Sequence, residues 1–119
     1  MNNTNKEFLC PLEYGLDLFK GKWTTRIICM LGSSGTLRYK EIRTGLKGMT
    51  DAVLAATLKD MAADGLIERR QFLEIPPRVE YSLTQKGKSA FEILKSICRW
   101  VQQFNVVLSD FSHPPCKKR

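Results

Sequence analysis

The chain has 119 residues, 43% of them hydrophobic and 26% charged, which is the size and balance of one soluble globular domain. No apolar run reaches the roughly 20 residues that a membrane span requires, and the start MNNTNKEF lacks the basic and apolar regions of a secretion signal, so we expect a cytoplasmic protein without a membrane partner. The net charge of +7 favours an anionic partner, and the wide spacing of the four cysteines predicts no metal site.

The first third of the chain is expected to form two helices within residues 9–31. Apolar residues recur there at about one helical turn, and Pro11 is well placed at a first helical position, where its missing amide hydrogen costs nothing. The first helix should end at Lys20 and Gly21. The second should run from Trp23 to the glycine-serine segment 32–35.

Two further helices are predicted next, the first of them brief, after an extended segment at residues 36–38. The first begins at Tyr39 and is followed at once by a turn containing Gly48. The second runs from Thr50 to Asp64, because the Thr50 hydroxyl can cap the free amides of its first turn. Its apolar stripe faces inward, and the opposite face carries unusually small side chains.

The remaining chain predicts a β-hairpin and a final helix. Residues 66–73 and 79–83 carry β-branched and aromatic side chains around the turn 74–78, whose tip would present Arg78 behind two prolines. Thr84 should then cap a last helix spanning residues 85–110. The apolar arc of this helix is wider than a small domain needs for itself.

This order of elements predicts one mainly α domain with a small β-hairpin, over residues 1–119. A helix-turn-helix followed by a two-stranded wing is a winged helix-turn-helix, an α+β fold in which the second helix of the pair lies in the DNA major groove. Residues 36–84 would form the DNA-binding core. Residues 36–49 carry four basic side chains against one acidic one, whereas the helix from Thr50 to Asp64 is net negative, so the attraction for phosphate would come from its flanks.

We expect the residues that contact DNA to lie on the small outward face of the Thr50 helix, on the basic segment before it and on the wing. Small side chains allow a helix to approach base edges closely, and basic ones bind phosphates. The alternative for each residue is an ordinary solvated surface. Asp51 either stabilises the helix start or accepts from a cytosine amino group. The candidates are Arg38, Lys40, Arg43, Lys47, Thr50, Ala52, Ala55, Ala56, Lys59 and Arg78.

Several of these segments together resemble the HxlR-type transcriptional regulators, a branch of the MarR-like winged helices. The resemblance is carried by Cys10-Pro11, the triplet GKW at residues 21–23, Arg38-Tyr39, LAATLKDMAADG at residues 54–65 and PPRVEYSLT at residues 76–84. It implies a homodimeric bacterial regulator that binds a pseudo-palindromic operator in double-stranded DNA, with the Thr50 helix in the major groove and the Arg78 wing beside it. We expect no enzymatic activity and no cofactor. Tyr39 stands where such proteins usually have Phe, and Asp51-Ala52 replaces their usual early residues of the recognition helix.

A homodimer is also favoured by the residues themselves. One recognition helix reads too few base pairs to be selective alone, and a second copy would cover the wide arc of the last helix. We expect the helices in residues 9–31 and 85–110 to dimerise, although the last helix could instead pack only within its own subunit. The expected interface residues are Phe8, Leu9, Leu12, Leu94, Cys98, Val101, Phe104 and Leu108.

Cys10 is the candidate for redox sensing. It lies at or beside the N-terminus of the first helix, where the helix dipole favours a thiolate, and the resemblance implies that some members sense electrophiles or oxidants with it. The alternative is an unreactive small residue. Cys29 and Cys98 fall on apolar stripes and are expected in the core, and Cys116 could act as a resolving thiol.

We therefore predict a dimeric, sequence-specific DNA-binding regulator, a repressor or an activator, in which a small electrophile or oxidant acts at Cys10. A change at the dimer interface would alter the separation of the two recognition helices. The alternative function is a winged helix used as a protein-interaction module, against which the basic flanks argue. A cysteine-dependent enzyme is disfavoured, because the only histidine, His113, lies near the end of the chain.

Overall fold

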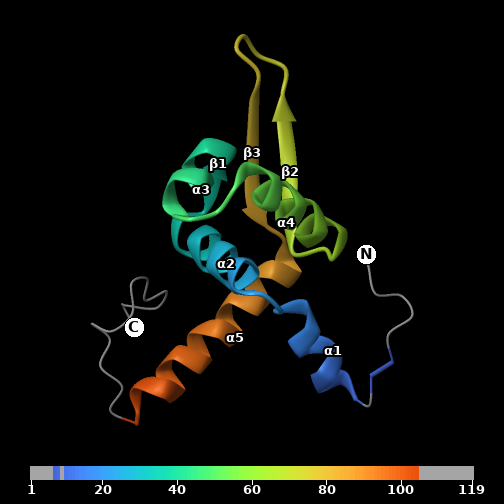
Figure 1. Cartoon of the computed structure of the whole chain (residues 1–119), viewed down its shortest axis with the longest axis vertical. Helices are drawn as coiled ribbons and strands as arrows, with labels where there is room; N and C mark the ends of the chain where they lie inside the picture. Colours follow the sequence, from blue (N-terminus) through green and yellow to red (C-terminus); the bar gives the residue numbers. More distant parts are fainter. Residues whose placement is uncertain (1–6, 9, 105–119) are drawn as a thin grey trace.

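The computed structural model describes residues 7, 8 and 10–104 and has the predicted winged helix-turn-helix architecture (Figure 1). Helices α3 and α4 form the helix-turn-helix, and strands β2 and β3 form the wing. In chain order the elements are α1 (Pro11–Leu18), α2 (Lys22–Ser34), β1 (Thr36–Arg38), α3 (Tyr39–Gly45), α4 (Asp51–Ala63), β2 (Ile67–Phe72), β3 (Arg78–Leu83) and α5 (Gln85–Gln102).

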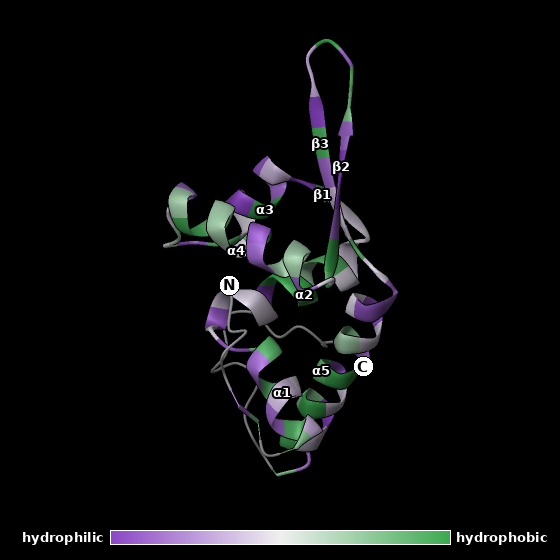
Figure 2. Ribbon diagram, turned by 90° about the vertical axis from the view of Figure 1, so that its right-hand side faces the viewer, coloured by the Kyte–Doolittle hydropathy of each residue, from purple (hydrophilic) through white to green (hydrophobic). Residues whose placement is uncertain are grey.

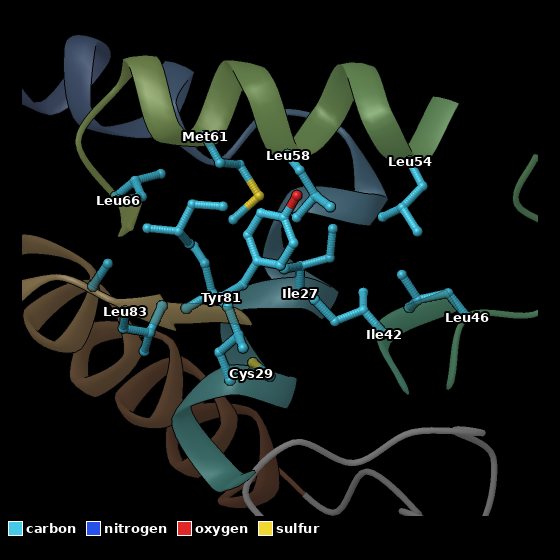
Figure 3. Close-up of a cluster of buried hydrophobic side chains, with 14 of the residues drawn as sticks. Ile27, Cys29, Ile42, Leu46, Leu54, Leu58, Met61, Leu66, Tyr81 and Leu83 are labelled. Atoms are coloured by element: carbon cyan, nitrogen blue, oxygen red, sulfur yellow. The ribbon is translucent and has the colours of Figure 1, made fainter. Parts of the chain in front are cut away.

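The core lies between α4, α2 and the base of the sheet (Figure 3). The inward stripe of α4 is as predicted, because Leu54, Leu58 and Met61 are all buried, and they face Ile27 of α2 and Tyr81 of β3. Fully burying an aliphatic side chain of this size contributes about 1.5–3 kcal/mol. This packing fixes the orientation of α4 and leaves its opposite face in solvent.

The sheet has three antiparallel strands in the order β1-β3-β2. The short strand β1, which leads directly into α3, pairs with β3, so the sheet connects the start of the helix-turn-helix to the wing. The hairpin loop is shifted by one residue from the prediction: β2 ends at Phe72, which pairs with Arg78 at the start of β3, so the loop comprises residues 73–77 in place of 74–78. Arg78 therefore lies at the base of the loop, because β3 begins one residue earlier than the sequence pattern indicated.

Helices α1 and α5 lie at the end of the molecule opposite the tip of the wing (Figure 2). They diverge from each other in the view of Figure 1, and both carry apolar side chains on their surfaces. On α1, Leu12 is exposed, whereas Phe8 is half-buried and its ring packs edge-on against Tyr14 at 5.4 Å between centroids. Leu9 and Leu108 lie outside the described residues.

The apolar arc of α5 serves two surfaces at once. Leu94, which we predicted at a dimer interface, is buried in the core, while Cys98 and Val101 are half-buried. The helix packs on α2 through this side. A second stripe, one helical turn apart, remains exposed, and we call it the α5 apolar face; it consists of Ile93, Ile97, Trp100 and Phe104.

Candidate nucleic-acid interface

Helix α4 begins with a cap made by its own sequence. The Thr50 hydroxyl accepts a hydrogen bond from the Val53 amide at 3.2 Å, which satisfies one of the unpaired donors of the first turn. The small outward face is exposed along its length as predicted, at Ala52, Ala55, Ala56 and Lys59. This face can approach another surface closely, because no side chain along it except that of Lys59 extends far from the helix.

Asp51, the first residue of α4, contacts two side chains of α3. Its Oδ1 accepts from Arg43 Nε at 2.7 Å and from the Tyr39 hydroxyl at 3.2 Å. Arg43 and then Tyr39 lower the pKa of the Asp51 carboxyl, while desolvation and the bond to Asp51 raise the pKa of Tyr39. Asp51 thus remains ionised and joins the two helices of the helix-turn-helix.

The other basic residues before α4 lie at the surface. The side chains of Arg38, Lys40 and Lys47 are exposed, as phosphate-binding residues would be. The backbone amide of Arg38 donates to Glu41 Oε1 at 2.8 Å, so the acidic residue of α3 is engaged in capping its own helix. The exposed cations Arg38, Lys40 and Lys47 therefore lie in a segment whose one acidic residue, Glu41, caps α3.

The sequence predicted that the tip of the wing would expose Arg78 to DNA, but most of the Arg78 side chain is buried. Its guanidinium lies 4.1 Å from the centroid of the Phe72 ring, and its nitrogens are 3.2 Å from carboxylate oxygens of Glu74 and Glu80. The Nε contact with Glu80 lacks the alignment of a hydrogen bond. Because the side chain is only 25% exposed and its charge is balanced by two carboxylates, Arg78 stiffens the wing and is a weak candidate for a minor-groove contact.

Sequence reasoning missed several exposed apolar residues of this surface. Val53 projects from α4, and Leu73 and Ile75 are almost fully exposed in the loop of the wing. The turn residues of the wing gave a signal for the loop, but no pattern indicated that its apolar side chains would lack cover. The contact between Tyr39 and Asp51 was also missed, since the two residues are twelve apart and belong to different helices.

The cysteines differ sharply in accessibility. Cys10 is exposed immediately before α1, where its carbonyl accepts from the Glu13 and Tyr14 amides. Cys29 is buried, and burial, together with Cys98, raises the pKa of its thiol from 9.0 to about 11, so Cys29 stays protonated at neutral pH. Only Cys10 among the described cysteines combines exposure with a position at a helix start. Cys116 and His113 lie outside the described residues.

Other types of site are absent from the part of the chain that the structure describes. No cluster of three or more His, Cys, Asp or Glu side chains there could hold a metal ion. None of the described helices is both long and apolar enough to cross a membrane.

A capped helix with a small exposed face, a basic segment before it and a hairpin beside it define a winged helix-turn-helix transcriptional regulator. More particularly, the chain belongs to the HxlR family, because the family model described as HxlR-like helix-turn-helix matches residues 18–107. The regulatory protein MalR of Fusobacterium mortiferum is 41% identical over 97 residues, which cover 82% of this chain and 92% of MalR. An HTH-type transcriptional regulator of Methanothermobacter thermautotrophicus is 40% identical over 98 residues, 82% of this chain and 74% of that protein.

Solved structures agree with this assignment. A MarR-family transcriptional regulator from Enterococcus faecalis V583 is 35% identical and superimposes with a TM-score of 0.76, covering 88% of this chain and 94% of its own. The redox regulator HypR in its reduced form is 30% identical and superimposes with a TM-score of 0.75, covering 86% of this chain and 100% of its own. The relatives are named as transcriptional regulators and not as enzymes, and the proteins similar to this chain include a redox regulator.

Proposed function

We propose that the protein is a homodimer that binds a pseudo-palindromic operator in double-stranded DNA, with α4 of each subunit in the major groove. The single observation that carries the proposal is the capped, small-faced helix α4 beside a cluster of exposed cations. Its outward alanines can approach thymine methyl groups, and Thr50 and Lys59 can reach bases or phosphates. Because α4 is itself net negative, the basic residues of the segment 36–49 provide the attraction.

The wing has a different part in this proposal from the one its sequence suggested. Its loop carries exposed Leu73 and Ile75 and one acidic residue, Glu74, which is paired with Arg78. Exposed cations of β2, Arg69 and Arg70, lie nearer the base of the hairpin. We expect phosphate contacts from that base and from α3, with Arg78 holding the hairpin rigid.

Two copies are needed because one α4 reads only a half-site. The side chains of the α5 apolar face are each about half exposed or more. Helix α1 adds the exposed side chains of Leu12 and Leu16 at the same end of the molecule (Figure 2). We propose that a second copy covers these residues, in place of the buried Leu94. The recognition helices would then be spaced by the packing of the α1 and α5 helices, which gives a change at that interface a route to DNA affinity.

The DNA-binding proposal predicts salt-dependent binding to a duplex of random sequence. In a titration followed by fluorescence anisotropy, the logarithm of the affinity should fall linearly with the logarithm of salt concentration, because bound cations displace counterions from phosphates. Replacing Lys40 and Lys47 together by alanine should weaken binding and reduce the slope by about one for each phosphate that is no longer neutralised. Selection from a random duplex pool would then give the operator and its half-site spacing.

The control for this measurement is Lys20→Ala, which removes one positive charge near the α1 end of the molecule and is compared with Lys40→Ala and Lys47→Ala made singly. Lys20 is exposed and lies near Asp17, well away from the helix-turn-helix. It should leave the slope unchanged. Absence of binding at low salt, or binding that ignores salt, would contradict the proposal and favour a winged helix that serves as a protein-interaction module.

We also propose that Cys10 senses an electrophile or oxidant. Its exposure and its position next to α1, part of the proposed dimer surface, support this role. Diamide should release the wild-type protein from its selected operator, while Cys10→Ser should remain bound, as measured by gel shift before and after treatment. Cys29→Ser is the control and should respond like wild type, because the buried thiol of Cys29 is protonated. Equal release of Cys10→Ser and wild type would remove Cys10 from the mechanism.

A further inference from the structure

An acidic residue at the DNA-facing end of α4 requires an explanation. The Asp51 side chain is 74% exposed, and in the proposed complex it would lie near the phosphates, which repel a carboxylate. The dipole of α4 accounts for a negative charge at this position by itself, but not for the two side chains that contact it. Both come from α3, and both bind the same oxygen, Oδ1.

Arg43 is held by only one of its donors. A guanidinium has five N–H groups in a rigid plane, and Asp51 engages the one on Nε. Within the described residues, no hydrogen bond or ion pair involves the Nη atoms of Arg43, whose side chain is 40% exposed. The edge formed by the two Nη groups is therefore available, and it has the geometry that matches two oxygens of a phosphate.

Tyr39 completes the arrangement from the other side. Its ring packs against the core, so the position of its hydroxyl is fixed, and the hydroxyl donates to Asp51 Oδ1 at 3.2 Å. Asp51 cannot rotate away without losing this bond as well as the one from Arg43. The three residues thus form a clip that fixes the Arg43 side chain relative to the start of α4.

We infer that Asp51 is a positioning residue, which holds Arg43 by Nε so that its Nη edge binds a DNA phosphate beside the N-terminus of α4. The inference rests on the proposed DNA binding. The clip removes in advance the rotational freedom that a free arginine would lose on binding. It also neutralises the carboxylate that would otherwise repel the phosphate, so the net effect of Asp51 on DNA affinity is favourable although its charge is negative.

The direction in which a substitution of Asp51 changes the affinity for the operator tests this inference. Asp51→Ala should weaken binding to the selected operator by about fivefold, because Arg43 loses its fixed orientation. Asp51→Asn, which keeps an acceptor oxygen without the charge, should lie between Asp51→Ala and wild type. Simple charge repulsion predicts the reverse, since either change removes a negative charge from the DNA-facing surface. Tighter binding of Asp51→Ala than of wild type would overturn the inference.

Asp60→Ala is the matched control, because it removes an equal charge from the same helix. Asp60 is exposed, and its side chain makes no hydrogen bond or ion pair with any residue that the structure describes. Its loss should leave binding unchanged or slightly tighter. If Asp60→Ala weakened binding as much as Asp51→Ala, the effect would belong to the helix in general and the clip would have no special role.

A double-substitution cycle separates positioning from the stability of α4. In the Arg43→Ala background, Asp51→Ala should no longer weaken binding, because no guanidinium remains to be positioned. Arg43→Ala should also lower the salt slope by about one per half-site, because it removes the cation that would neutralise the phosphate. A loss of the same size in both backgrounds would show that Asp51 only stabilises the helix, and would overturn the inference.

The two proposals fail in different ways. If the wild-type protein did not bind any duplex, DNA binding and the clip would both be wrong. Suppose instead that wild type bound with the expected salt dependence, and that replacing Lys40 and Lys47 weakened binding. Tighter binding by Asp51→Ala would then reject the clip alone.

Discussion

Gly87→Ala is expected to lower the free energy of unfolding by about 2–3 kcal/mol, because a methyl group has no room at this position. A Cβ built on Gly87 would overlap the Leu66 carbonyl oxygen and lie 3.0 Å from a Leu83 methyl group. The obstacle is mainly the backbone of Leu66, which precedes β2, so the first turn of α5 must move away from it. Urea unfolding followed by circular dichroism, at one protein concentration for all variants, measures the change.

The close approach at Gly87 is fixed by a cap that involves the same atoms. The Thr84 hydroxyl accepts from the Gly87 amide at 3.0 Å and donates to the Gly65 carbonyl at 2.6 Å, and the Thr84 amide donates to the Leu66 carbonyl at 3.1 Å. Moving the first turn would weaken this set of bonds. The turn between α4 and β2 is therefore tied to the start of α5, and this set of bonds connects α4 to the proposed dimer surface.

Gly15→Ala is the control for this prediction. Gly15 is also within a helix, but a Cβ there would have no neighbour within 4 Å among the described residues. Alanine should stabilise the helix by up to about 1 kcal/mol relative to glycine. A Gly87→Ala protein as stable as wild type would mean that α5 can shift without cost, and that the coupling between α4 and α5 is loose.

The fold was predictable from the sequence because its signals are local. Thr50 and Thr84 cap the helices as expected, and the apolar periods of Leu54, Leu58 and Met61 gave the buried side of α4 directly. Each of these signals depends on residues within two helical turns of one another. Asp51 is the first residue of α4, as the sequence predicted, but its contacts with Arg43 and Tyr39 join two helices and have no local signal.

The surface was harder to predict because it depends on contacts between elements. The pairing of Arg78 with Phe72, and the two carboxylates beside it, follow from the strand register, which a turn pattern leaves open by one residue. Similarly, Leu94 and Ile97 are both apolar residues of one helix, and only the packing of α5 on α2 decides that Leu94 is buried and Ile97 exposed. Those choices determine which residues can face DNA or a second copy.

If the protein forms the proposed dimer, Ile97→Glu is expected to convert it to a monomer and to weaken operator binding by about two orders of magnitude. The substitution places a charge in the middle of the α5 apolar face, flanked by Ile93 and Trp100, which a second copy would otherwise bury. Two linked α4 helices bind their half-sites at a high effective concentration, and separate subunits lose that advantage. Sedimentation velocity at micromolar concentration measures the mass, and fluorescence anisotropy measures the affinity.

Gln102→Glu is the matched control, because it adds the same charge to the opposite side of α5. Gln102 is exposed and lies about half a turn around the helix axis from the α5 apolar face. It should remain dimeric and bind the operator like wild type. If Ile97→Glu were still a dimer, the second copy would have to meet another surface, and exposed Leu12 and Leu16 of α1 would be the next residues to substitute. If wild type were already a monomer at micromolar concentration, the exposed stripe of α5 would need a partner other than a second copy, and each α4 would have to bind DNA without help from a second subunit.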